Sequence, residues 1–74
     1  MGRVLTVGNY RVYVWAEEGG KHHRPHCHVF WPDGRCVVAI DTIEILVGTP
    51  SRRAVQIVAA HIDIIRAEWA RLNP

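Results

Sequence analysis

The first half of the chain alternates apolar and polar residues with a period of two, which is typical of β-strands whose two faces meet different surroundings. Residues 3–7 and 10–16 are rich in Val, Tyr and Trp, and Gly8-Asn9 between them tolerates the positive φ angles of a tight turn. We therefore predict a hairpin. One face of its second strand is mixed and carries Arg11, Tyr13 and Trp15. The other face is apolar and carries Tyr10, Val12 and Val14.

A second hairpin is predicted from residues 26–31 and about 36–40, which flank the Pro-Asp-Gly-Arg turn at 32–35. One face of this hairpin is wholly apolar and must cover the core, because neighbouring residues on a strand point to opposite sides. The core face carries Cys27, Val29, Trp31, Cys36, Val38 and Ile40. The outer face carries His26, His28, Phe30, Val37, Ala39 and Asp41.

The register of the second hairpin decides which polar side chains meet on its outer face. The four-residue turn leaves Trp31 opposite Cys36, and His26 then lies opposite Asp41. A carboxylate that accepts a hydrogen bond from one imidazole nitrogen orients the ring and raises the basicity of the other nitrogen. We therefore expect Asp41 to orient His26.

The last third of the chain changes to the period of a helix. Thr49 or Ser51 is suited to cap its start, with Pro50 in the first turn. The segment 42–47 before it is apolar enough for a fifth strand or a short helical turn. The predicted fold is α+β, an antiparallel sheet of four or five strands with one long C-terminal helix packed on one face. The apolar stripe of this helix consists of Val55, Val58, Ile62, Ile65, Trp69 and Leu72.

The composition is that of a small domain rich in apolar side chains. We expect residues 1–74 to form one domain, and 49% of them are hydrophobic while 22% are charged. A chain of this size often hides part of its apolar surface against another molecule, so we expect a homodimer or a partner protein. The net charge of +2 is too mild to indicate nucleic-acid binding by itself. The start of the chain does not resemble a signal peptide and no apolar run can span a membrane, so we expect a cytoplasmic protein without a membrane partner.

The two cysteines are expected to be reduced residues of the core. In the predicted register, Cys27 and Cys36 lie four residues apart along the ladder, roughly 13 Å, which exceeds the reach of a disulfide. A zinc site that joins Cys27 to its neighbours His26 and His28 is disfavoured because adjacent strand residues face opposite sides.

Four of the five histidines fall within residues 22–28, where imidazole can ligate a metal or transfer a proton near neutral pH. Three interpretations stay open. His26 and His28 are polar residues on the solvent face of the sheet, or they form a catalytic group with Asp41 that cleaves RNA without a metal. In the third interpretation His26 and His28 bind zinc or nickel together with His22, or with His23 or Asp41 in its place, although no established metal-ligand spacing is present.

Strand 10–16 adds a candidate binding surface beside these histidines. A cation and two aromatic rings on one strand face suit phosphate contact and base stacking, although Tyr and Trp are also simply common in strands. The candidate binding residues are Arg11, Tyr13, Trp15, His22, His23 and Arg24.

The motif Pro25-His26-Cys27-His28-Val29 resembles the Pro-His-x-His-Val strand of a small bacterial family, the domain of unknown function numbered 4160. The resemblance implies a short cytoplasmic bacterial protein, often encoded beside a second small domain in a layout typical of toxin-antitoxin modules, and it implies no assigned activity. Where family members have an acidic residue or proline before the motif, this chain has His22-His23-Arg24. Further matches in the family's order are Val4-Leu5, Gly8, Tyr10-Arg11, Glu18-Gly19, Gly34, Ser51-Arg52-Arg53 and a late Trp in the helix.

Taken together, the residues and the resemblance favour a toxin-antitoxin-associated or regulatory domain without a cofactor. We expect it to bind a protein partner or RNA through the face that carries His26 and His28. The alternatives are a metal-independent endoribonuclease and a histidine-based module that binds zinc or nickel.

Overall fold

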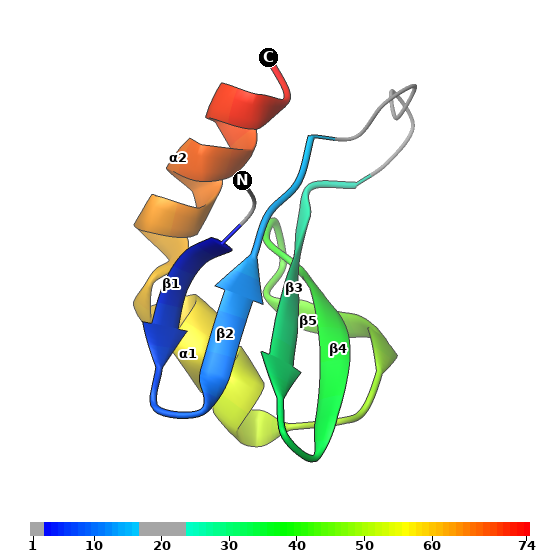
Figure 1. The fold of residues 1–74 in the computed structure, drawn as a ribbon. Helices are drawn as coiled ribbons and strands as arrows, with labels where there is room; N and C mark the ends of the chain where they lie inside the picture. The colour runs from blue at the N-terminus through cyan, green and yellow to red at the C-terminus, as the bar shows by residue number, and fades with distance from the viewer. Residues whose placement is uncertain (1–2, 17–23) are drawn as a thin grey trace.

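A computed structural model describes residues 3–16 and 24–74 of the chain (Figure 1). Five strands form one antiparallel sheet in which the spatial order follows the chain, and two helices complete the fold. The α+β prediction is confirmed, and the segment that was open between a strand and a helical turn supplies the fifth strand. The elements are β1 (Arg3–Val7), β2 (Tyr10–Tyr13), β3 (His26–Trp31), β4 (Gly34–Ala39), β5 (Glu44–Gly48), α1 (Arg52–Ala60) and α2 (Ile62–Leu72).

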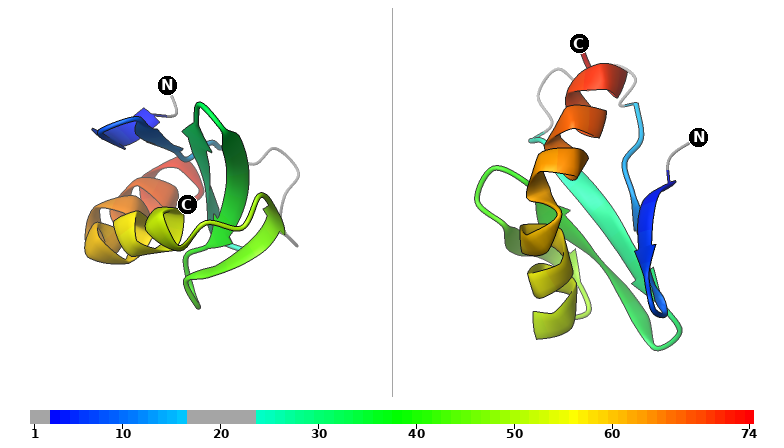
Figure 2. Two further views of the ribbon diagram at one scale, coloured as in Figure 1. Left: turned by 90° about the horizontal axis from the view of Figure 1, so that it is seen from below. Right: turned by 90° about the vertical axis from the view of Figure 1, so that its left-hand side faces the viewer.

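The sheet curves around the helices, which lie on its concave side (Figure 2). The core between the two layers contains only apolar side chains among the described residues. Alternation along the strands places these side chains, because every second residue of a strand faces the helices. The core residues are Val12, Val14, Cys27, Val29, Cys36, Val38, Ile40, Ala54, Ile57, Val58 and Ile65.

The predicted register between β3 and β4 is wrong by two residues. Trp31 lies opposite Gly34, so the turn contains only residues 32 and 33, and His26 lies opposite Ala39. This register depends on the glycine at position 34, because a Cβ there would stand 3.0 Å from the Trp31 ring. The predicted faces survive, since a slip by an even number of residues keeps every side chain on its side of the sheet.

The predicted single helix is also corrected, because His61 separates α1 from α2. The backbone of His61 departs from helical geometry at φ −119° and ψ 25°, and its N–H donates to Ile57 and Val58. Its ring nitrogen Nδ1 lies 3.0 Å from the Ile57 carbonyl oxygen, so the side chain competes for a helical acceptor. The first helix is capped by Ser51, one of the two predicted caps.

The helical stripe follows the prediction at most positions and departs from it at others. Val58 and Ile65 are fully buried, as their spacing predicts. Ala54 and Ile57 lie outside the predicted stripe but are 0% and 2% exposed and belong to the core, whereas Ile64 is 56% exposed. The change in direction at His61 alters which side chains reach the sheet. Neither helix in the described part of the chain is long and apolar enough to cross a membrane.

Candidate functional site

The convex face of the sheet carries most of the predicted functional side chains. Strand pairing places Phe30 between Arg11 on β2 and Arg35 on β4, in one row across the sheet. Directly paired residues share a face of the sheet, so both arginines flank the Phe30 ring on the side away from the helices. The next row consists of Tyr13, His28, Val37 and Val47.

Five rings on this face contact one another in a continuous cluster, which we call the aromatic platform: Tyr13, Trp15, His26, His28 and Phe30. Trp15 stacks on Tyr13 with ring centroids 5.4 Å apart, and His28 meets Trp15 edge to face at 4.5 Å. Phe30 lies edge to face against Tyr13 at 5.5 Å. The rings of His26 and His28 are 5.2 Å apart. The structure thus brings together the predicted histidines and the aromatic residues of strand 10–16.

His26 stands where the platform meets the end of α2. Its Nδ1 lies 2.7 Å from the carbonyl oxygen of Arg24, and its ring centroid is 5.2 Å from that of Trp69. A carbonyl oxygen only accepts hydrogen bonds, so Nδ1 carries the proton in this contact. In the neutral ring the lone pair is then on Nε2, which is the form required of a general base.

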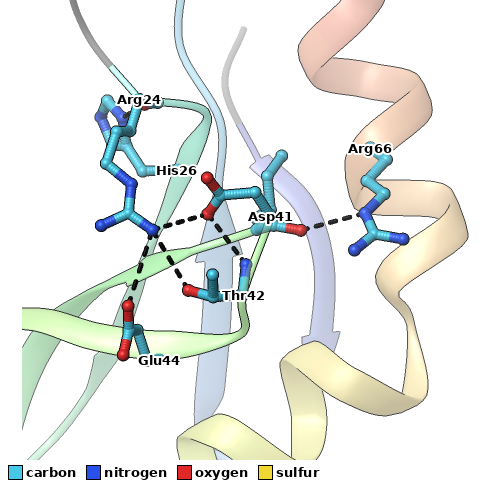
Figure 3. Close-up of polar contacts among 7 residues, drawn as sticks. Arg24, His26, Asp41, Thr42, Glu44 and Arg66 are labelled. Carbon is cyan, nitrogen blue, oxygen red and sulfur yellow. Dashed lines mark hydrogen bonds and ion pairs between the residues drawn. The ribbon is translucent and has the colours of Figure 1, made fainter.

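The predicted cross-strand pair of His26 with Asp41 is not formed, because the register places Asp41 beyond the partner of His26. The Asp41 carboxylate instead accepts hydrogen bonds from Nη2 of Arg24 at 2.9 Å and from the backbone N–H of Thr42 at 2.8 Å (Figure 3). The same Nη2 lies 3.6 Å from a carboxylate oxygen of Glu44. The hydrogen bond from Arg24 holds the pKa of Asp41 below its usual value.

The connection between β4 and β5 is therefore held from two sides. Arg24 binds Asp41 on one side, while Nε of Arg66 on α2 donates to the carbonyl oxygen of Ile40 at 3.0 Å on the other (Figure 3). Within this turn Ile43 adopts a φ of 58°, which is uncommon for a β-branched residue. These contacts tie the segment that leads into β3 to the neighbouring connection between β4 and β5.

A pocket of about 360 Å³ opens beside the platform, over β3, β4 and β5. Its walls consist of two ring-bearing residues of β3, of Arg35 and its neighbours on β4, and of residues of β5. The lining residues are His28, Phe30, Arg35, Cys36, Val37, Val47 and Gly48.

A family model described as a domain of unknown function (DUF4160) matches residues 9–70. The chain belongs to the DUF4160 family. The match contains every residue of the platform and of the pocket, which confirms the resemblance seen in the Pro-His-x-His-Val motif. No curated protein and no solved structure matches the chain at a significant level.

The two cysteines of this DUF4160 chain belong to the core, as predicted. Both are free and buried, and burial, with a smaller contribution from Cys36, raises the pKa of Cys27 to about 12. Because Cys36 lies opposite Val29, the two cysteines are separated by two residues along the ladder instead of the predicted four. A thiol with such a high pKa is a poor nucleophile and a poor metal ligand near neutral pH.

The predicted metal ligands include residues outside the described part of the chain. His22 and His23 lie there, so the structure does not place them relative to His26 and His28. Within residues 3–16 and 24–74, no group of three or more His, Cys, Asp or Glu side chains is arranged to hold a metal ion.

Sequence reasoning missed Arg35 and Val47 as residues of this site. Arg35 was assigned to the turn, although Gly34 and Arg35 both belong to β4. Val47 lies in the segment whose structure was left open, so its neighbours across the sheet were unknown. Assuming a two-residue turn at Pro32-Asp33 would have predicted Arg35 as a residue of this site, because such a turn places residue 35 opposite residue 30.

Proposed function

We propose that this DUF4160 domain binds single-stranded RNA on the convex face of its sheet. The observation that carries the proposal is the aromatic platform with Arg11 and Arg35 beside it. Unpaired bases stack on exposed rings of antiparallel sheets, while arginines contact the phosphates that connect these bases. Duplex RNA keeps its bases stacked on each other and has no free ring faces to offer, so a single strand is the better fit.

The exposure of the platform supports a contact surface rather than a packing role. The helices cover the concave face, and Trp15 on the other face keeps 39% of its surface exposed. Val47, in the row of Tyr13 and His28, is 62% exposed. Contiguous apolar surface of this kind mostly marks a place where another molecule binds.

The charges around the platform favour an anionic partner. Arg11 and Arg35 are exposed, and neither forms an ion pair within the described residues. Arg24 is different, since its guanidinium is held by Asp41. The two arginines beside Phe30 are therefore available for phosphates on either side of a stacked base.

Fluorescence anisotropy with a labelled, unstructured 12-nucleotide RNA tests the proposal at low salt. Stacking on one ring contributes about 1–3 kcal/mol, so Trp15→Ala weakens binding at least about fivefold. Ile64→Ala is the matched control, because Ile64 is a large apolar residue on α2 that is 56% exposed. Circular dichroism shows whether each variant remains folded. A wild-type domain that does not bind the RNA, or equal losses in the two variants, overturns the proposal and leaves a protein partner as the occupant of the face.

The salt dependence of binding separates the arginines from the rings. Each phosphate contact to a single strand contributes about −0.7 to the slope of log K against log salt. Arg11→Ala is expected to reduce the slope by about that amount, whereas Trp15→Ala leaves it unchanged. Arg53→Ala is the control, since Arg53 is an exposed arginine at the start of α1. A reduced slope in the control shows nonspecific attraction instead of a contact at the platform.

A second candidate function is metal-independent cleavage of the bound RNA. It is favoured by the contact between His26 Nδ1 and the Arg24 carbonyl, which orients the ring and fixes its tautomer, and by the 5.2 Å between the ring centroids of His26 and His28. His26 removes the proton of a ribose 2′-hydroxyl, the oxygen attacks the adjacent phosphorus, and His28 protonates the departing 5′-oxygen. Cleavage in the presence of EDTA with 2′,3′-cyclic phosphate ends, lost in His26→Ala, supports this function. Binding without cleavage by the wild type restricts the domain to binding.

The toxin-antitoxin layout implied by the family motif leads to a test in cells. The wild type and a His26→Ala, His28→Ala double variant are expressed in a bacterial host while growth and total RNA integrity are followed. Growth arrest with RNA degradation in the wild type alone supports a toxin that cleaves RNA. Normal growth with both folded proteins excludes an autonomous toxin and directs the search to a bound partner or a metal.

A further inference from the structure

The pocket beside the platform has the size and the wall chemistry of a small-ligand site. Its volume of about 360 Å³ lies at the lower end of the range for small-molecule pockets, about 300–1,000 Å³. It is continuous with the platform, because His28 and Phe30 line the pocket and also contact the other rings. A ligand in the pocket is therefore in reach of a strand that crosses the platform.

The pocket offers three kinds of surface. The rings of His28 and Phe30 are nearly parallel, with 12° between their planes and 6.4 Å between their centroids, and so present two similar faces. Val37 and Val47, which are paired across β4 and β5, supply an apolar wall. Arg35 supplies an exposed positive charge in the row of Phe30. A planar ring that carries an anionic group matches this combination.

We propose that the pocket binds one nucleotide of the RNA strand, with its base on the rings and valines and its phosphate on Arg35. This inference rests on the proposed function and names the subsite that anchors the strand. In this arrangement the base lies between the Val47 side chain, which it buries, and the ring of Phe30. The phosphate accepts charge-assisted hydrogen bonds from the guanidinium, which is the side chain best suited to phosphate oxygens.

β5 contains a matched pair of residues for the test. Val47 and Leu46 are adjacent, apolar and exposed, at 62% and 42%. Val47 is paired with Val37 and lines the pocket, whereas the β4–β5 ladder skips Leu46 in a bulge and Leu46 is not part of the lining. Val47→Asp therefore places a carboxylate in the pocket, and Leu46→Asp places the same charge on the same strand outside it.

The probes are adenosine 5′-monophosphate, adenosine and inorganic phosphate, followed by NMR of the valine methyl groups. The monophosphate is expected to shift the methyl signals of Val37 and Val47, and Val47→Asp is expected to weaken its binding at least tenfold while Leu46→Asp changes it less than twofold. Arg35→Gln is expected to weaken monophosphate binding about tenfold or more and adenosine binding less than twofold, because only the phosphate contacts the guanidinium.

The outcomes separate this inference from the proposed function. If the monophosphate leaves the methyl signals unchanged, or if inorganic phosphate reproduces its effect, the pocket is not a nucleotide subsite. If the 12-nucleotide RNA binds through Trp15 but Val47→Asp leaves its affinity unchanged, the proposed function stands and the subsite is wrong. If the monophosphate binds with the expected dependence on Arg35 and the RNA does not bind, the pocket is confirmed as a nucleotide site and the proposed function fails.

Discussion

Replacing Gly48 by alanine tests a close backbone approach that holds β5, and with it the Val47 wall of the pocket, against β4. Gly48 has a φ of 106°, a conformation that residues with a side chain rarely adopt. A Cβ at this position would stand 2.5 Å from the carbonyl oxygen of Arg35 and 2.7 Å from Cα of Cys36. Both neighbours are backbone atoms, so no rotation of a side chain relieves the overlap.

The magnitude follows from two separate costs. The unfavourable φ costs about 1–3 kcal/mol, and forcing an extra carbon into a packed position costs about 1–3 kcal/mol more. Together they approach the ~4–11 kcal/mol that stabilises a domain of this length. Gly48→Ala is therefore expected to lower the free energy of unfolding by roughly 2–6 kcal/mol and to loosen β5.

Gly8→Ala is the matched control, because Gly8 also has a positive φ, 57°, but a Cβ there meets no atom within 4 Å. It carries the conformational cost alone, about 1–2 kcal/mol. Urea unfolding followed by circular dichroism and tryptophan fluorescence measures both variants against the wild type. Equal losses of stability in Gly8→Ala and Gly48→Ala refute the argument, since they show that the approach of the two strands adds no cost.

Three further predictions concern buried, charged and capping groups. Cys27 is expected to react with a thiol reagent at pH 8 only in unfolded protein, and a native protein that reacts at the rate of the unfolded chain contradicts this. The free energy of unfolding is expected to fall as the pH rises from about 9 towards 12, because only the unfolded chain ionises this thiol in that range. Because the pKa of Asp41 is lowered, its ionised carboxylate stabilises the fold above the ordinary pKa of 3.8, and this contribution is lost as the pH falls below that value. Asp41→Asn is therefore expected to weaken the dependence of stability on pH in acid, measured by urea unfolding. An unchanged dependence excludes the ion pair. Ser51→Ala removes the oxygen that accepts a hydrogen bond from the N–H of Ala54, and it is expected to lower the stability measured by thermal unfolding by about 1 kcal/mol. Thr49→Ala, at the other predicted cap, is expected to change stability little. A larger loss in Thr49→Ala than in Ser51→Ala would place the cap at residue 49.

The strand pattern was predictable because it depends on local geometry. The bounds of β3, His26–Trp31, agree with the prediction, and the inner positions Cys27 and Val29 are fully buried. Face assignment needs only the alternation of side chains, so it survived an error of two residues in the register between β3 and β4. The clustering of His26 and His28 on one side of a strand was accessible for the same reason.

The composition of the candidate site was only partly predictable. Tyr13 and Trp15 lie beside the histidines, as the alternation of strand 10–16 suggests. The positions of Arg35 and Val47 could not be predicted, because they depend on the turn at 32–33 and on the pairing of β5 with β4. The partner of Asp41 was predicted wrongly because the observed register moves Asp41 away from His26, and Arg24, in an irregular segment, binds the carboxylate instead. Contacts made by turns and loops have no period in the sequence that would reveal them.

The sequence by itself determined which residues of the two hairpins face the core, roughly where the first four strands lie, and that a helical segment covers one side of the sheet. Only the tertiary structure decided the register of β3 against β4, the break at His61 and the exchange of His26 for Arg24 as the partner of Asp41. The physical reason is a difference in range. Side-chain alternation and helical periodicity arise between residues a few positions apart, whereas a strand register or an ion pair is selected by contacts between residues distant in the chain, such as the 17 positions from Arg24 to Asp41. The break at His61 is local, but it depends on a contact between the His61 ring and the Ile57 carbonyl that the helical period does not reveal.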